Sequence, residues 1–346
     1  FPGNPEFLIL LGETLLQQSE FNKARRTFEE LSPSPAREYY LGIMAVYYNE
    51  FQNARDLLGG VTGDAEYGDR ARIVTAAFDE FDLFPDSSEL HLRLLLTKAL
   101  NELGFHEMAI QKAKSILEER EDYRDAWIIL GHSYLALERY ALARNVLEQA
   151  RELDPTKPES TFFLALAQSA LGDHEQAITH LSMARENGFK PEAEVTKALA
   201  ETFLAAQYYE AARQEFEKLI ERQGNAAEAY VQPVRISIEL LDDPTTAKLL
   251  AEQAVEYNPE SIVAQNLLGW ALLEGGEYAR AQETLDRVIS AQPDYAPAYL
   301  NLGRLHENQD NTDQAVEYFK TAYELAPHSE IGALAAERYN ALVLGE

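Results

Sequence analysis

A repeat of fixed length runs along this chain, and it restricts the fold more than any other feature of the sequence. A Leu-Gly pair recurs, and after each pair an alanine and then a Leu or Phe follow at constant spacing, as Ala143 and Leu147 follow Gly131. The pairs are Leu11-Gly12, Leu41-Gly42, Leu130-Gly131, Leu268-Gly269 and Leu302-Gly303. Gly269 and Gly303 are one period apart, roughly 34 residues. Such self-similarity predicts an array of similar units that pack only on their neighbours.

Within one unit the apolar spacing is helical. Trp127, Leu130 and Tyr134 share one face of a first helix, and Ala143 and Leu147 continue on a second. Small residues at the Gly131 and Ala143 positions let the two helices approach closely. Glycine or short polar residues form the turn between them, and a proline ends the second helix in three units, at Pro155, Pro293 and Pro327.

This pattern resembles the tetratricopeptide repeat family. The residues that carry the resemblance are Trp127, Leu130, Gly131, Tyr134, Tyr140, Ala143, Leu147, Ala150 and Pro155. The resemblance implies an all-α protein, a right-handed α-solenoid of about nine helix pairs. The predicted units are 5–34, 35–64, 90–123, 124–157, 158–192, 193–227, 228–261, 262–295 and 296–329.

These units predict four segments. Residues 1–64 hold N-terminal units, 65–89 an irregular helix and candidate hinge, 90–329 a continuous array, and 330–346 a capping helix. The unit 228–261 departs most, because Pro233 lies inside its first helix and Ala251 stands where a large residue is usual, which predicts a kink or a local loosening. Residues 59–89 contain several glycines around a helical stretch at 71–84. They are interpreted as a decayed repeat or, alternatively, as a hinge or dimerisation element.

The charge disfavours two classes of partner. With 58 acidic and 30 basic residues, the chain has a formal net charge of -28, which repels nucleic acid and anionic membranes. No apolar run of about 18 residues predicts a membrane span. The chain lacks cysteine and begins at Phe1 without a signal sequence. We interpret it as a processed or trimmed segment, and favour the bacterial cytoplasm or periplasm.

The sequence predicts no enzyme, metal or cofactor. The stretch Gly131-His132-Ser133-Tyr134-Leu135 lacks the final glycine of a nucleophile elbow. The polar residues 308–313 lack the glycine and bidentate glutamate of a calcium loop, and are interpreted as a helix cap. Zinc-protease and nucleotide-binding motifs are absent from the sequence.

The resemblance implies that ligands bind on the concave face, which the first helix of each pair lines. Residues one and five places after the Trp127 position are the candidates for this groove. The predicted partner-binding residues are Tyr39, Ile43, Tyr47, Leu94, Lys98, Ile128, His132, Phe162, Leu166, Lys197, Asn266, Trp270, Asn301 and Arg304. From Tyr39 to Leu166 this stripe is apolar and suits a helix or extended peptide. Arg304 is suited to a carboxylate. The alternative is that winding of the array buries these residues.

We therefore expect a non-catalytic scaffold that binds a protein or peptide. Phe162→Ala and Trp270→Ala are expected to weaken binding while leaving helicity intact. The alternatives are a self-associating structural subunit, or a repeat module of a larger enzyme. A family variant that clamps two carboxylates with Lys, Asn and Arg is rejected, because Lys98 and Lys197 are isolated.

Overall fold

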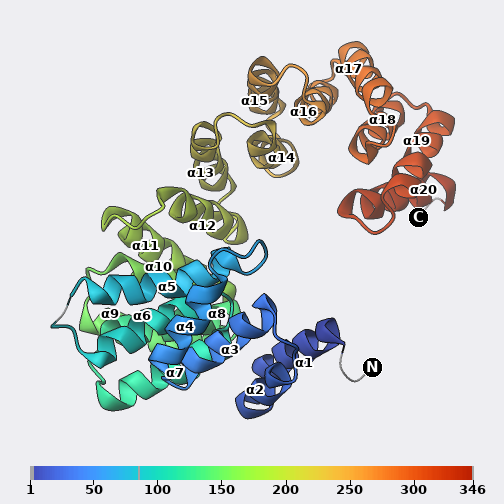
Figure 1. Cartoon of the computed structure of the whole chain (residues 1–346). Coiled ribbons are helices and arrows are strands. Elements are labelled where there is room, and N and C mark those ends of the chain that lie inside the picture. The colour runs from blue at the N-terminus through green and yellow to red at the C-terminus, as the bar shows by residue number, and fades with distance from the viewer. Residues whose placement is uncertain (1–3, 85, 345–346) are drawn as a thin grey trace. The chain divides into compact units, whose positions relative to one another are not determined.

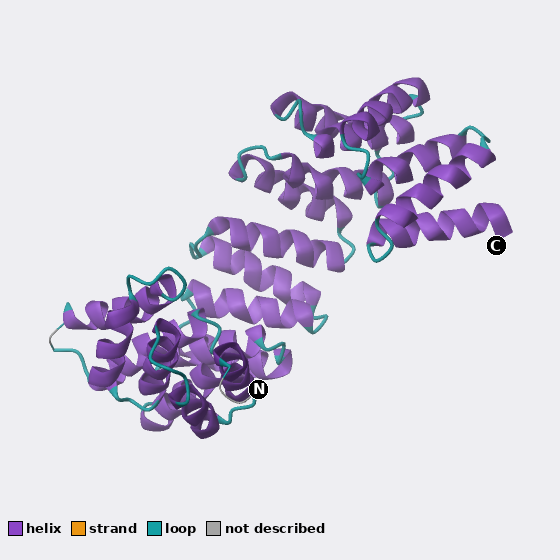
Figure 2. Cartoon of the chain, turned by 45° about the vertical axis from the view of Figure 1, so that its right-hand side comes forward, coloured by secondary structure: helices purple, strands orange, loops and turns teal. Residues whose placement is uncertain are grey.

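The computed structural model describes residues 4–84 and 86–344, and every regular element within them is a helix (Figure 2). Residues 1–3, 85 and 345–346, which belong to the predicted segments 1–64, 65–89 and 330–346, lie outside these ranges. The chain divides into two compact units, Phe1–Phe189 and Lys190–Glu346 (Figure 1). This boundary falls inside the segment 90–329 that was predicted to be continuous.

The described part of unit 1 (Phe1–Phe189) contains five helix pairs and one further helix. Its helices are α1 (Pro5–Gln17), α2 (Phe21–Glu29), α3 (Pro35–Tyr47), α4 (Phe51–Val61), α5 (Gly68–Asp82), α6 (Glu89–Glu102), α7 (His106–Glu119), α8 (Arg124–Ala136), α9 (Tyr140–Leu153), α10 (Pro158–Ala170) and α11 (His174–Glu186). Helix α5 stands between the pairs α3–α4 and α6–α7.

The described part of unit 2 (Lys190–Glu346) contains four helix pairs and a closing helix. Its helices are α12 (Glu192–Ala205), α13 (Tyr209–Arg222), the 3₁₀ turn η1 (Ala227–Tyr230), α14 (Val231–Glu239), α15 (Pro244–Tyr257), α16 (Ile262–Glu274), α17 (Tyr278–Ala291), α18 (Ala296–Asn308), α19 (Thr312–Leu325) and α20 (Glu330–Leu344). The pairs of both units begin at or within a few residues of the predicted unit boundaries. The prediction of an all-α solenoid is confirmed.

The repeated glycine is the contact point of each pair in which it occurs. A Cβ atom on Gly42 would lie 2.6 Å from Cγ of Leu58, and one on Gly269 would lie 2.6 Å from Cδ2 of Leu285. Leu58 and Leu285 are fully buried. The large residue of the second helix therefore occupies the space that a side chain on the first helix would need, as the spacing predicted.

Each pair turns through one residue with positive φ, seven positions after the Gly position. In three pairs this residue is glycine, at Gly104, Gly172 and Gly276, with φ between 74° and 86°. In the other described pairs it is Ser19, Asn49, Glu138, Gln207, Asp242 or Asp310. Because left-handed backbone costs a residue with a Cβ roughly 1–2 kcal/mol, the helix contacts on either side must hold these six turns.

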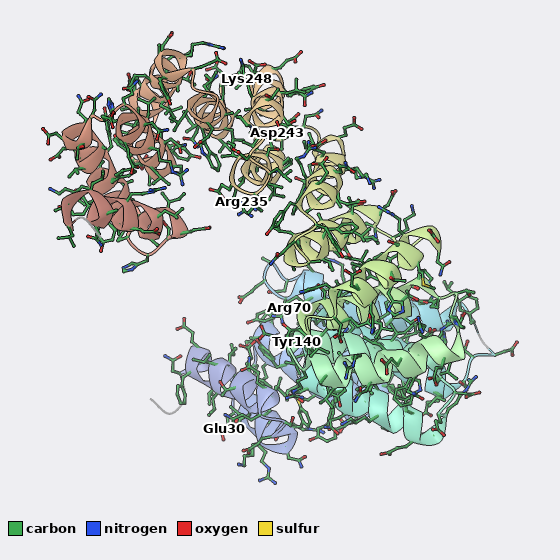
Figure 3. All side chains as sticks on the ribbon, turned by 180° about the vertical axis from the view of Figure 1, so that it is seen from behind. Glu30, Arg70, Tyr140, Arg235, Asp243 and Lys248 are labelled. Atoms are coloured by element: carbon green, nitrogen blue, oxygen red, sulfur yellow. The ribbon has the colours of Figure 1, made fainter. Side chains whose placement is uncertain are left out.

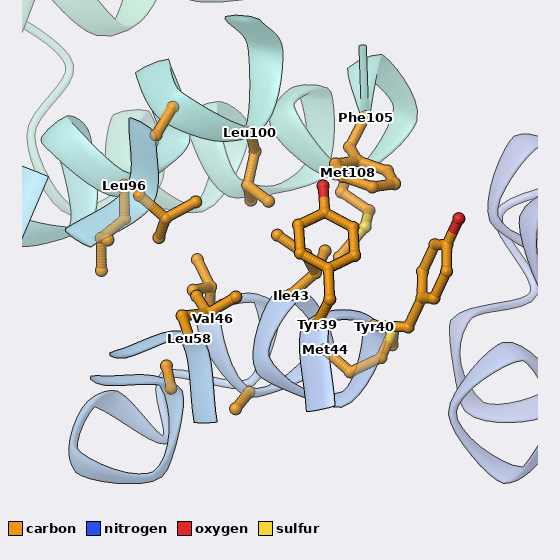
Figure 4. Close-up of a cluster of buried hydrophobic side chains, with 14 of the residues drawn as sticks. Tyr39, Tyr40, Ile43, Met44, Val46, Leu58, Leu96, Leu100, Phe105 and Met108 are labelled. Carbon is orange, nitrogen blue, oxygen red and sulfur yellow. The ribbon is translucent and has the colours of Figure 1, made fainter. Parts of the chain in front are cut away.

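Helix α5 changes how unit 1 packs. Helix α5 packs on both α4 and α6, and α1 contacts α7. As Figure 4 shows, Tyr39 and Ile43 of α3 point toward Leu100 and Met108. All four residues belong to one buried cluster, which extends from α1 to α7. The face of α3 that was predicted to line a groove is thus covered by the chain itself.

Lys112 of α7 joins the two parts of this fold. It is only 5% exposed, and its ammonium group donates to the carbonyl oxygen of Tyr47 at 3.1 Å and to the side chain of Asn49. Burial lowers the pKa of Lys112 to about 8. The turn between α3 and α4 is thereby attached to α7.

In unit 2, the structure differs from the prediction at Pro233 and agrees with it at the capping helix α20. Pro233 does not kink a long helix. The first helix of this pair begins as the 3₁₀ turn η1, and Pro233 lies in the first turn of α14, where its missing N–H costs no helical hydrogen bond. At the C-terminal end, α20 packs on α18 and α19, with Leu334, Tyr339 and Leu342 against the buried Phe319 cluster.

We predict that Gly131→Leu destabilises the protein by about 3 kcal/mol or more, because the new side chain overlaps buried Leu147. The matched control is Gly59→Ala in α4, where no atom lies within 4 Å of the added Cβ. This control should gain roughly 0.5–1 kcal/mol from helix propensity. Urea unfolding followed by circular dichroism measures both. Equal effects of the two substitutions would contradict this packing.

A second prediction concerns pH. The folded pKa of Lys112, about 8, lies below its ordinary value near 10.5, so the unfolded chain binds this proton more tightly. Stability of the wild type relative to Lys112→Met should therefore rise between about pH 8 and pH 10.5, by roughly 1–3 kcal/mol. Urea unfolding of both proteins at pH 7, 8, 9 and 10 measures the difference, and a difference that falls with pH would contradict the assignment.

Candidate partner-binding site

A pocket of about 260 Å³ in unit 2 is the candidate site. It is built from the first helices of successive pairs, α14, α16 and α18, and from α20. Its lining residues are Ile238, Glu239, Trp270, Glu274, Arg304, Glu307, Asn308 and Arg338. The repeat generates this arrangement, because Trp270 and Arg304 directly follow Gly269 and Gly303 and so occupy the same position in adjacent units.

Each carboxylate of the pocket has a donor nearby. Glu274 accepts a hydrogen bond from the Trp270 indole at 3.2 Å, and Glu307 pairs with Arg338 at 3.6 Å. Glu239 pairs with Arg235 at 3.6 Å. The three acids are therefore already engaged within the pocket and its rim.

Arg304 is different. Its guanidinium lies over the Trp270 ring, 5.5 Å from the centroid, and among the described residues no oxygen lies in ion-pair or hydrogen-bond range. Burial lowers the pKa of Arg304, yet a guanidinium stays protonated at neutral pH. Arg304 is thus a partly desolvated cation whose N–H donors are open to a ligand.

Two buried asparagines join α16 to α18 beside this pocket. The side-chain amide of Asn301 donates to Oδ1 of Asn266 at 3.2 Å, and the two residues are 3% and 6% exposed. Asn266 and Asn301, both predicted site residues, are thus close together in the structure but largely covered. Their hydrogen bond fixes the distance between the helices that carry Trp270 and Arg304.

The predicted groove residues of unit 1 need correction. Tyr39 and Ile43 are fully buried in one cluster with residues of α5, α6 and α7. Leu94, Ile128 and Phe162 are also buried, because neighbouring first helices pack on each other. Phe162 stacks on Phe189 with ring centroids 4.0 Å apart. None of these five side chains is open to a partner in this structure. Winding of the array, the alternative interpretation, accounts for Leu94, Ile128 and Phe162. Tyr39 and Ile43 are covered by a fold-back of the chain that the sequence pattern did not predict.

The other predicted residues of the first helices lie at intermediate or exposed positions. Tyr47, His132 and Leu166 are half-buried, and Lys98 and Lys197 are exposed. His132 belongs to a closed network, since its Nδ1 lies 2.5 Å from the Asn101 amide, which also contacts His106 and Ser133. Burial lowers the pKa of His132. Lys197 pairs with Glu201 at 3.7 Å.

Sequence reasoning missed the second turn of the pocket wall. Glu274 and Asn308 come four positions after Trp270 and Arg304, so they extend the same helix face by one turn. Taking positions nine after the Trp127 position, as well as one and five, would have found both. Arg338 comes from α20, outside the repeat, and no periodic signal could have placed it here.

Residues 4–84 and 86–344 contain neither a metal-binding cluster nor a membrane-spanning helix. No group of three or more His, Asp or Glu side chains there is arranged to hold a metal ion. No helix in the same ranges is long and apolar enough to cross a membrane.

Comparison with known proteins gives the following similarities. One model of the tetratricopeptide repeat matches residues 98–158 and 266–330, and a second matches 134–198. No curated protein matches the chain. Among solved structures, a repeat protein from Parabacteroides merdae is 14% identical, with a TM-score of 0.48 over 73% of this chain and 98% of that one. The Cut9–Hcn1 hetero-tetramer of the APC/C is 12% identical, with a TM-score of 0.45 over 99% and 78%.

The structure revises the expectation for Phe162. We predict that Phe162→Ala destabilises the protein by about 3–5 kcal/mol, because it opens a cavity beside Phe189. Leu142→Ala on α9 is the control, since Leu142 is 47% exposed and its loss should cost less than about 0.5 kcal/mol. Thermal and urea unfolding measure both. A Phe162→Ala protein as stable as the wild type would return Phe162 to the set of open groove residues.

Proposed function

Since this chain belongs to the tetratricopeptide repeat family, we propose that it is a non-catalytic protein-interaction scaffold whose unit 2 binds a peptide segment of a partner. The pocket between α14, α16, α18 and α20 is the binding site, and Arg304 receives a carboxylate of the peptide. The observation that carries this proposal is the guanidinium of Arg304, held over Trp270 without an acidic partner among the described residues.

The guanidinium of Arg304 can form a paired hydrogen bond with a carboxylate of the peptide. A carboxylate can accept two parallel N–H bonds from arginine, and such charge-assisted pairs are among the stronger hydrogen bonds in proteins. Burial lowers the pKa of Arg304, while the carboxylates of Glu239, Glu274 and Glu307 raise it, so the guanidinium is partly desolvated in the folded protein. An arriving carboxylate therefore gains the pairing without the full cost of desolvating both partners.

The surrounding groups suit an extended peptide backbone. Glu274 and Glu307 keep acceptor capacity beyond their single donors, and Asn308 can both donate and accept. Main-chain N–H and C=O groups of an extended segment require such partners on both sides. Trp270 is 8% exposed, so its ring serves mainly as the floor that holds Arg304 in position.

The acidic net charge adds a condition on the whole partner. At a formal charge of -28 the protein repels a strongly acidic protein at long range. We therefore propose a partner that is neutral or basic overall and places one carboxylate into the pocket. Its association should be moderately slower at high salt.

A selection from a phage-displayed library of random peptides tests this function. Peptides recovered on the wild-type protein should carry an aspartate, a glutamate or a free C-terminal carboxylate. Arg304→Met should weaken their binding at least about tenfold, because it removes the paired charge. Isothermal titration calorimetry measures the affinities.

The matched control is Arg280→Met on α17, where Arg280 pairs with Glu277 away from the pocket. It should leave peptide affinity within about twofold. Recovered peptides without any carboxylate, or peptides that bind the Arg304→Met and Arg280→Met proteins equally well, would refute the proposed site. Concentration-dependent sedimentation separates this function from self-association.

A further inference from the structure

Unit 1 contains a cavity of about 470 Å³ that is separate from the predicted groove. It arises where α1 and α5 meet the turn between α6 and α7 and the turn after α8. Ligand sites in proteins commonly have volumes of about 300–1,000 Å³. Since the fold-back of α1–α4 onto α7 creates this cavity, the repeat pattern alone does not predict it.

The cavity wall is half apolar. Leu16 comes from α1, Leu103 and Phe105 from the turn after α6, Met108 from α7 and Leu137 from the end of α8. Phe105 and Met108 are buried and belong to the cluster drawn in Figure 4. Such a wall can cover a short hydrocarbon chain.

Three of the four charged side chains in the wall have partners. Arg139 pairs with Glu107, and Glu13 accepts a hydrogen bond from the Tyr40 hydroxyl at 2.5 Å. Arg70 of α5, labelled in Figure 3, lies over the Tyr39 ring at 5.0 Å and the Phe105 ring at 5.8 Å. Among the described residues, no carboxylate lies in ion-pair range of Arg70.

One acceptor, the hydroxyl of Tyr39, lies close to the guanidinium of Arg70. The hydroxyl of Tyr39 is buried and has no partner in the described part of the chain. Stacking on aromatic rings attracts a guanidinium but satisfies none of its N–H groups. An anionic oxygen in the cavity would therefore meet donors that the protein leaves unsatisfied.

The charge balance selects the kind of anion. Two guanidiniums, of Arg70 and Arg139, face two carboxylates, of Glu13 and Glu107. His106 also lines the cavity, and burial lowers its pKa, which disfavours the charged imidazolium. The four charges of the guanidiniums and carboxylates sum to zero, so the two carboxylates repel a dianion such as phosphate about twice as strongly as a monoanion. The guanidinium of Arg70, which has no ion pair among the described residues, can receive one carboxylate.

We propose that this cavity binds a small organic monocarboxylate. The carboxylate lies on the guanidinium of Arg70, and the hydrocarbon part packs against Leu16, Leu103, Phe105 and Met108. This site is independent of the peptide pocket around Arg304 in unit 2.

Isothermal titration calorimetry of the full chain with four probes tests the ligand class. Hexanoate should bind, while hexanol, hexylammonium and inorganic phosphate should bind at least tenfold more weakly. This comparison depends on no substitution, so a variant that fails to fold cannot obscure it. Absence of hexanoate binding at millimolar concentration, or binding of phosphate as tight as that of hexanoate, would overturn the proposal.

Three variants then locate the site. Arg70→Met should weaken hexanoate binding at least tenfold. Arg55→Met is the matched control, since Arg55 also lies over an aromatic ring, Phe78 at 4.8 Å, but pairs with Asp82 outside the cavity. It should leave affinity within twofold, and so should Arg304→Met. Loss of hexanoate binding in Arg304→Met but not in Arg70→Met would place the carboxylate in unit 2 and refute this site without refuting the peptide site.

Discussion

The close approach of two helices at one small residue is the contact on which the rest of the structure depends. Where Gly42, Gly131 or Gly269 recurs, the facing leucine of the second helix fills the space above the glycine backbone. This contact fixes the separation of the helices within a pair, and the turn with its left-handed residue closes the pair. Pairs built alike then present equivalent side chains at equivalent places. Trp270 and Arg304 meet across α16 and α18 for this reason, one repeat apart in the sequence.

The single helix α5 shows what happens when this regularity stops. Helix α5 stands alone between two pairs, and α3 shares one buried cluster with α5, α6 and α7, so that Tyr39 and Ile43 are part of the core. Lys112 and the contact of α1 with α7 hold this arrangement. The same departure that removes the apolar groove of unit 1 creates the cavity around Arg70.

Much of the fold follows from the sequence because it depends on local spacing. The helix starts at Pro35, Arg124, Pro158 and Ile262, and the glycine contacts, are readable from residues within one unit. The exposure of a first-helix residue is different, since it depends on the neighbouring unit. Ile128 and Phe162 are buried by the winding, and Tyr39 by a segment that is distant in the sequence. Arg304 and Trp270 were identified because their repeat position lines the pocket. Arg70 lies in the segment without repeats, where no position could be aligned.

Arg70 and Arg304 share one property: each is a partly buried guanidinium that lies over an aromatic ring and has no ion pair among the described residues. In a chain with 58 acidic residues, a carboxylate is rarely far from an arginine. Nevertheless acids that line the two cavities interact with other groups: Glu13 with Tyr40, Glu239 with Arg235, Glu274 with Trp270 and Glu307 with Arg338. The aromatic rings hold the guanidiniums in place without neutralising them. Because the acid excess of the whole chain repels polyanions, each site favours a ligand with a single carboxylate over one that carries several charges.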